Sequence, residues 1–285
     1  MDTAMNASPQ PNSVSGQSTP RHYSSIVCDA DTPVLFADTL RALNGAGVEF
    51  LVGGAFALSR YTGIERFTKD LDVFVRESDC ARALETLAGI GCQTEWTFRH
   101  WLAKARRDDA LIDVIYSSGN GFARVDDVWF RHAPDAEVCG VPCRLSPAEE
   151  LIWSKSFVME RERFDGADVM HMIRGVGPTL DWPRLIARFG EHWRVLLSHL
   201  VIYGFVYPSA RHQIPAWVTD ELTQRLASGW NDDLRNGKTC FGTLLSREQY
   251  LPDLQRFGYV DGRLVAGCMT PGEIAEWTGA IEQEE

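Results

Sequence analysis

Apolar and polar residues in the first half of the chain follow the periods of strands and helices. Strands are predicted where apolar residues alternate with polar ones or form short runs, at 48–52, 69–75, two within 95–116, and 138–145. Helices are predicted where apolar residues recur every three or four positions, at 32–44, between Gly54 and Gly63, and at 78–90. The pattern therefore predicts an α/β (α+β) unit with a mixed sheet of about five strands.

The second half of the chain has mainly helical spacing. Ser146-Pro147-Ala148-Glu149 is a capping box with proline in the first turn, and it predicts a helix that continues to about Phe164. Further helices are predicted at 182–189, 191–203 and 216–227. We therefore expect a disordered tail over 1–30, rich in Ser, Pro, Asn and Gln, an α/β domain over 31–145 and a helical domain over 146–285.

Two carboxylates share one face of the strand predicted at 69–75. Side chains alternate along a strand, so Asp70 and Asp72 point the same way while Leu71 and Val73 point the other way. Adjacent carboxylates on an apolar strand repel each other and favour a compensating divalent cation. The turn at Gly53-Gly54 would place backbone N–H groups beside this cation, where they could hold a phosphate.

The Gly53-Gly54 turn, its spacer and Asp70-Leu71-Asp72 resemble the signature of the nucleotidyltransferase superfamily of DNA polymerase β. The chain is similar to the bacterial branch that includes AbiEii-type abortive-infection toxins and uncharacterised nucleotidyltransferases. The resemblance is strongest over 50–75 and extends to about residue 174. It implies a nucleotidyltransferase core followed by a mainly helical C-terminal domain.

The resemblance also implies a catalytic and metal-binding set of three acids that holds two Mg²⁺ ions. Asp70 and Asp72 supply two of them. Asp113, inside the apolar strand 111–115, is the candidate for the third acid and for the group that deprotonates or orients the attacking hydroxyl. The alternative interpretation is that Asp113 faces water at a strand end or pairs with an arginine.

Four residues are candidates for binding the nucleotide: Gly53, Gly54, Thr68 and Lys155. Thr68 shares a strand face with Asp70, so it could support that carboxylate. Lys155 lies in an apolar stripe of its helix, which is unusual for lysine, and the resemblance implies contact with the triphosphate. Its alternative role is to extend along a surface between domains with its amine in water. Asp165 and Asp168 are expected to pair with Arg161 or Arg163.

These features predict a Mg²⁺-dependent enzyme that moves a nucleoside monophosphate from a nucleoside triphosphate, ATP among the candidates, to a hydroxyl group with release of pyrophosphate. The acceptor stays open between an RNA end such as tRNA, a protein and a small molecule. The resemblance to toxins adds an antitoxin protein as a candidate partner. The alternative is a non-catalytic nucleotide-binding or partner-binding module on the same fold.

Charge and cysteine content narrow these alternatives. The net charge is −11, and residues 220–285 hold six basic and twelve acidic residues, which disfavours a large nucleic-acid footprint on this part. A basic cluster at 99–107 is expected to be a solvated hairpin face, with contact to polyphosphate or an acceptor stem as its alternative. The seven cysteines and the lack of a recognisable secretion signal predict reduced thiols in the cytoplasm. The sequence has no apolar run long enough to span a membrane, so we expect no membrane partner.

Overall fold

A five-stranded mixed sheet forms the first half of the protein. The structure is a computed structural model that describes residues 32–229 and 237–281, so the tail predicted over 1–30 lies outside the described residues. The sheet has the order β1-β2-β5-β4-β3, in which β2 and β5 are parallel and the other neighbours antiparallel. Its strands are β1 (Leu51–Val52), β2 (Asp70–Phe74), β3 (Gln93–Phe98), β4 (Leu102–Arg107) and β5 (Ala110–Ile115).

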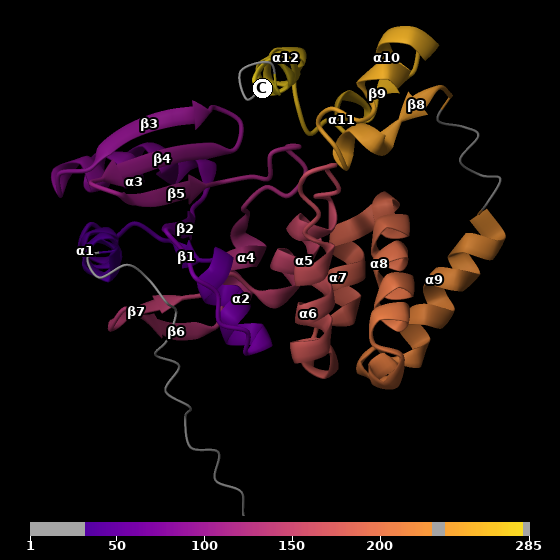
Figure 1. Ribbon diagram of the computed structural model, residues 1–285, viewed down its shortest axis with the longest axis horizontal. Helices are drawn as coiled ribbons and strands as arrows, with labels where there is room; N and C mark the ends of the chain where they lie inside the picture. The colour runs from indigo at the N-terminus through magenta and orange to yellow at the C-terminus, as the bar shows by residue number, and fades with distance from the viewer. Residues whose placement is uncertain (1–31, 230–236, 282–285) are drawn as a thin grey trace, which may run out of the picture.

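Helices surround this sheet and form most of the second half. Figure 1 shows the sheet at the left, a group of helices at the right and a C-terminal segment above both. The helices up to the first gap are α1 (Thr32–Gly45), α2 (Gly54–Thr62), α3 (Glu77–Gly89), α4 (Asp127–His132), α5 (Ala148–Ser156), α6 (Gly166–Val176), α7 (Trp182–Phe189), α8 (Trp193–Val206) and α9 (Ala216–Gly229). The C-terminal segment holds β8 (Thr239–Cys240), α10 (Leu251–Phe257), β9 (Val260–Asp261), α11 (Gly262–Val265) and α12 (Pro271–Gly279). None of the helices in the described ranges is long and apolar enough to cross a bilayer.

Packing between these elements makes one continuous apolar core. Helices α1 and α3 contact the sheet, α2 contacts both β2 and α6, and α5 packs against α6, α7 and α8. The buried apolar cluster runs from Leu35 to Met269, across the domain boundary predicted at residue 145. The division into two domains stays a prediction.

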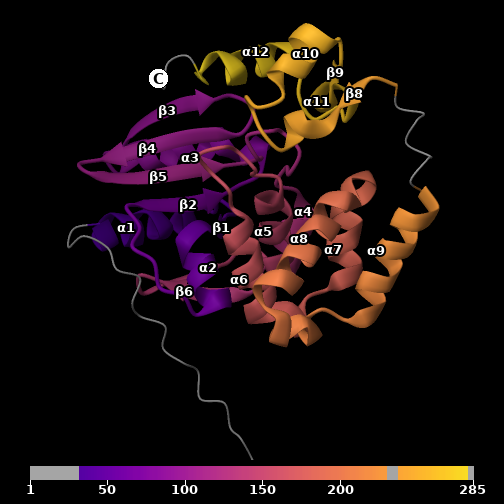
Figure 2. The same ribbon diagram turned by 45° about the vertical axis from the view of Figure 1, so that its right-hand side comes forward.

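The C-terminal segment is held against two loops of the rest of the chain, as the turned view in Figure 2 also shows. The amide of Asn120 donates to the carbonyl of Leu244 over 2.6 Å, and the backbone N–H of Arg247 donates to Glu160 over 2.7 Å. The ring of Trp277 contacts the ring of Phe98 edge-on, with centroids 4.8 Å apart. These contacts join α12 to β3, and they join the loops that carry Asn120 and Glu160 to residues 244–247.

The predicted mixed sheet of five strands is confirmed, but two of its predicted members differ. Residues 93–115 form three strands rather than two, because β4 and β5 are joined by a tight turn at Asp108-Asp109 that contains no glycine. The strand predicted at 138–145 is present only in part, as a shorter strand outside the five-stranded sheet. A turn at Cys139-Gly140 splits it into the separate hairpin of β6 (Asp135–Val138) and β7 (Val141–Arg144).

The prediction of one helix from Ser146 to about Phe164 is also wrong at its end. Helix α5 ends at Ser156, and residues 157–165 form a loop closed by a bridge between Met159 and Phe164. The backbone N–H of Met159 donates to Leu245 over 2.9 Å, a tertiary bond that a continued helix could not make. The other predicted helices of the second half are present, and α7 has the predicted bounds.

A buried ion-pair group fixes α5 against α7. The side chain of Glu150 is fully buried, and both of its oxygens accept from Nη1 of Arg184, at 2.6 and 2.5 Å. Nε of Arg188 donates to the same carboxylate over 3.1 Å, and the rest of its guanidinium forms two bonds to Asp126, each 2.8 Å long. Because these charges lie away from water, each needs its partners.

Glu150→Ala should therefore lower the free energy of unfolding by about 2–3 kcal/mol, since it removes the fully buried carboxylate shared by two arginines and leaves Arg184 with Glu149 and Arg188 with Asp126. Urea unfolding measures the change. The matched control is Glu162→Ala, whose partner Arg161 lies 3.3 Å away with both side chains about three-quarters exposed. This control should cost less than about 1 kcal/mol. Equal losses in the two variants would contradict the account.

Candidate functional site

The pairing of β2 with β5 brings three carboxylates to one face of the sheet. In the parallel register Asp72 lies opposite Asp113, and Asp70 lies opposite Leu111. The alternate residues of both strands, Leu71 and Val73 on one and Ile112 and Val114 on the other, are completely buried. Asp70, Asp72 and Asp113 therefore occupy adjacent positions on the same face, as side-chain alternation requires.

The glycine turn lies against these carboxylates. The backbone N–H of Gly53 donates to the carbonyl of Asp72 over 3.0 Å, and α2 begins at the next residue. Gly54 has φ +51°, and a Cβ added there would fall 1.6 Å from Oδ2 of Asp72. A Cβ on Gly53 would fall 2.2 Å from the ring of Phe74. Only glycines let the N-terminus of α2 approach the carboxylate this closely.

Burial, reinforced by neighbouring carboxylates, raises the pKa of two of these acids. Burial, together with the nearby carboxylates of Asp70 and Asp113, raises the pKa of Asp72 to about 7, while Lys155 and Arg163 act in the opposite direction. Burial also raises the pKa of Asp113, against the effect of Lys104. The face is thus short of positive charge at neutral pH.

Lys104 is the direct partner of Asp113. The two residues face each other across the β4–β5 ladder, with Nζ 3.8 Å from Oδ1. Oδ1 of Asp113 is buried and makes no hydrogen bond to the described residues. The pairing expected for Asp113 under its alternative interpretation is thus present, with a lysine rather than an arginine.

Thr68 acts on Asp70 through its hydroxyl. This side chain is buried, and Oγ1 donates a short hydrogen bond to Oδ1 of Asp70 and contacts its backbone carbonyl over 2.9 Å. We therefore expect Thr68 to orient Asp70 rather than to bind the nucleotide itself.

Lys155 belongs to a cluster of five charged residues beside Asp72. Its Nζ lies 2.8 Å from Oδ2 of Asp165 and 2.9 Å from Oδ2 of Asp168. Arg163 forks onto Asp165 with bonds of 3.1 and 3.2 Å, and Arg66 pairs with Asp168. Burial alone would raise the pKa of both carboxyls, but these cations outweigh it and hold each pKa below the usual range. We call these residues the ion-pair cluster: Arg66, Lys155, Arg163, Asp165 and Asp168.

The expected pairing of the two acids is therefore correct for Arg163 and wrong for Arg161. Arg161 pairs instead with its neighbour Glu162. The sequence prediction also missed Arg66 and Lys155 as partners of these acids. The missed signal is the spacing of Asp165 and Asp168 by three residues, which places both on one face of the start of α6.

The carboxylate face has the chemistry of a site for a divalent cation. Burial raises the pKa of Asp72 and of Asp113, and one oxygen of Asp113 makes no hydrogen bond to the described residues. In their present rotamers, however, no three acid, histidine or cysteine side chains of the described residues form a group that could hold a metal ion. Asp70 and Asp72 share one strand face and could both ligate a cation, and Asp113 would have to turn from Lys104 to join them.

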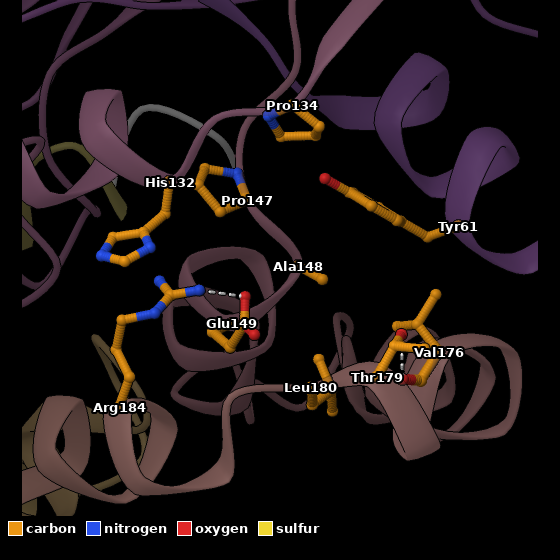
Figure 3. Close-up of a pocket in the computed structure, with 10 residues that line it drawn as sticks. All are labelled: Tyr61, His132, Pro134, Pro147, Ala148, Glu149, Val176, Thr179, Leu180 and Arg184. Carbon is orange, nitrogen blue, oxygen red and sulfur yellow. Dashed lines mark hydrogen bonds and ion pairs between the residues drawn. The ribbon is translucent and has the colours of Figure 1, made fainter.

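A separate pocket of about 210 Å³ lies at the other end of α2. Figure 3 shows Tyr61 on one side of it and Glu149 and Arg184 on another. These two charged side chains pair with each other at 2.5 Å, and the Tyr61 hydroxyl donates to Ser146 over 2.9 Å. Because its charges are already matched and no predicted site residue lines it, this pocket is not the candidate site.

A family model described as "Nucleotidyl transferase of unknown function (DUF2204)" matches residues 35–186, more than half of the chain. The chain belongs to this nucleotidyl transferase family. The matched range contains the glycine turn, the three carboxylates and the ion-pair cluster. The protein is thus a nucleotidyltransferase, and the predicted superfamily is confirmed.

Three solved structures are similar to this nucleotidyltransferase at low sequence identity. The solution structure of antibiotic-resistance factor ANT(2'')-Ia is 16% identical over 73% of this chain and 97% of that chain, with a TM-score of 0.38. The lincomycin-bound lincosamide antibiotic adenylyltransferase LnuA is 12% identical over 49% and 94%, with a TM-score of 0.36. JHP933 from Helicobacter pylori is 12% identical over 70% and 94%, with a TM-score of 0.38. No curated protein matches the chain.

Gly54→Ala should destabilise this nucleotidyltransferase more than the same replacement at a glycine where the new Cβ would meet no other atom. Gly63 is the matched control, because it has φ +69° and no atom within 4 Å of an added Cβ. Gly63→Ala should cost about 1 kcal/mol from backbone strain alone. Gly54→Ala should cost at least about twice as much, since it must also displace Asp72. Urea unfolding compares them, and equal costs would refute the close approach.

Asp72→Asn should stabilise the metal-free nucleotidyltransferase at neutral pH. The folded protein keeps the Asp72 proton up to about pH 7, whereas the unfolded chain loses it near 3.8, so the wild type loses stability as pH rises through this window. Asparagine removes that loss. The difference in melting temperature should be small near pH 4, grow up to about pH 7 and then level off, with a gain of about 1–3 kcal/mol. A difference that does not change with pH would contradict the assignment.

Proposed function

We propose that this protein is a Mg²⁺-dependent enzyme that transfers a nucleoside monophosphate from a nucleoside triphosphate to a hydroxyl acceptor and releases pyrophosphate. The observation that carries the proposal is the juxtaposition of Asp70, Asp72 and Asp113 with the Gly53-Gly54 start of α2. Carboxylates beside a helix N-terminus supply oxygen ligands for Mg²⁺ and backbone donors for phosphate in one place.

In this proposal Asp70 and Asp72 hold two Mg²⁺ ions, with Asp113 as the third ligand. When bound, magnesium would neutralise the negative charge of the phosphates during transfer. Thr68 keeps Asp70 oriented, and the Gly53-Gly54 turn binds phosphate oxygens through the N–H of Gly54, because the N–H of Gly53 already donates to Asp72. Lys155 assists at the triphosphate from the side of the ion-pair cluster.

The transfer step is an exchange at the α-phosphorus. The acceptor oxygen forms a bond to this phosphorus, and the bond to the pyrophosphate oxygen breaks. The proton of the acceptor hydroxyl goes to the carboxylate of Asp113, which lies opposite Asp72 in the strand register. The electron pair of the broken bond stays on the oxygen of pyrophosphate, which is the leaving group.

The acceptor that we favour is not a nucleic acid with a long phosphate backbone. Three cations of the β3–β4–β5 hairpins are already paired, Lys104 with Asp113, Arg106 with Glu95 and Arg107 with Asp38. The acidic excess over residues 220–285 adds to this. A small molecule or a protein hydroxyl is therefore the proposed acceptor, with tRNA as the competing test substrate. Cytoplasmic location and an antitoxin partner stay predictions from the sequence.

The test is incubation of the purified protein with each α-labelled nucleoside triphosphate, Mg²⁺ and a panel of small hydroxyl compounds, proteins and tRNA. We expect label to appear on an acceptor and unlabelled pyrophosphate to be released. Asp72→Asn should reduce transfer by at least about 10³-fold and Asp113→Asn by about 10²-fold or more. Asp109→Asn, an exposed acid in the β4–β5 turn, is the control and should transfer normally.

Two results would overturn the proposal. Transfer that persists in Asp72→Asn would mean that the carboxylate face is not the active site. Nucleotide binding by the wild type without label transfer to any acceptor would favour the alternative of a non-catalytic nucleotide-binding module.

A further inference from the structure

The ion-pair cluster holds three cations with only two carboxylates. Lys155 is buried to more than four-fifths, and both carboxylates that bind it are about nine-tenths buried. Because Asp165 and Asp168 already take two of its three N–H donors, Lys155 has one donor left for a phosphate. The cluster as a whole carries a charge of +1.

The two arginines occupy the open side of this cluster. The side chain of Arg163 is 69% exposed and that of Arg66 is 39% exposed, although each is anchored to a buried carboxylate. Among the described residues, Arg163 bonds Asp165 through Nε and Nη2, and its Nη1 has no hydrogen-bond acceptor. Arg66 pairs with Asp168 through Nη2. Each guanidinium therefore keeps donors for a further anion.

Both arginines also lie close to the carboxylate face. Arg66 is four residues before Asp70 in the chain, next to the segment in which Thr68 orients that acid. Arg163 is close enough to Asp72 for the two charges to affect each other's pKa. A guanidinium binds phosphate oxygens through parallel N–H donors, which suits it to a terminal phosphate better than an ammonium.

The backbone that carries Arg163 is fixed at both ends. The N–H of Met159 donates to Leu245, and the N–H of Asp165 donates to Val158 over 3.1 Å. Between them, the carboxylate of Glu160 accepts from the backbone N–H of Arg247. The loop is thus held by the C-terminal segment, while most of the Arg163 side chain is exposed.

We propose that Arg163 and Arg66 bind the β- and γ-phosphates of the donor nucleotide, with Asp165 and Asp168 as positioning residues that hold these arginines and Lys155 beside the carboxylate face. This inference rests on the proposed function for the identity of the donor. It adds a binding role for Arg163, which the sequence pattern does not assign, and it gives Arg66, just before the Asp70-Leu71-Asp72 segment, a defined phosphate contact.

The test is calorimetric titration of inorganic triphosphate, with Mg²⁺ present, into the wild type, Arg163→Gln and Arg66→Gln. Each variant should bind triphosphate about tenfold more weakly, because it loses one charge-assisted contact. AMP, which has neither a β- nor a γ-phosphate, should bind all three proteins equally. Arg163→Lys should recover part of the loss, since it keeps the charge without the fork.

Arg161→Gln is the matched control, from the same loop and with its partner Glu162 outside the cluster. It should bind triphosphate like the wild type, and urea unfolding should show all variants folded. Unchanged triphosphate binding in both Arg163→Gln and Arg66→Gln, an equal loss of AMP binding, or no triphosphate binding by the wild type would overturn the inference. Absence of nucleotidyl transfer together with selective triphosphate loss would instead overturn the proposed function alone.

Discussion

The repulsion between Asp72 and its neighbours is the constraint on which the rest of the site depends. Parallel pairing of β2 and β5 places Asp72 beside Asp113, and the alternation along β2 adds Asp70 to the same face. A sheet face of this kind costs stability unless cations approach it. Lys104 approaches from β4 and the ion-pair cluster from α5, α6 and the adjoining loops. The buried carboxylates therefore lower the stability of the fold and at the same time favour the binding of a further cation.

Two other features keep this face accessible and rigid. Glycines at 53 and 54 allow the N-terminus of α2 to lie against Asp72, which any side chain at these positions would prevent. The buried group of Glu150, Arg184 and Arg188 fixes α5, the helix that carries Lys155, against α7. The charges of the site are therefore placed by elements whose own positions are set by turn geometry and by buried ion pairs.

Local patterns in the sequence predicted the parts of this site that lie close together in the chain. The glycine turn, the shared face of Asp70 and Asp72 and the five-stranded sheet followed from periodicity and from a family resemblance. Lys104 as the partner of Asp113 was missed because the Asp108-Asp109 turn lacks glycine; with that turn known, counting back along the hairpin gives the pair. The end of α5 at Ser156 could not be predicted, since it depends on bonds from Met159 and Glu160 to residues about 85 positions later.

The most direct test of the central claim is calorimetric titration of Mg²⁺ into the protein at pH 7 in two buffers that differ in ionisation enthalpy. The account predicts that Mg²⁺ binding releases a proton, because the cation takes the place of the proton that Asp72 holds up to about pH 7. Affinity should rise with pH through this range, and the proton release should disappear in Asp72→Asn. Binding that releases no proton, or that is unchanged in Asp72→Asn, would contradict the account.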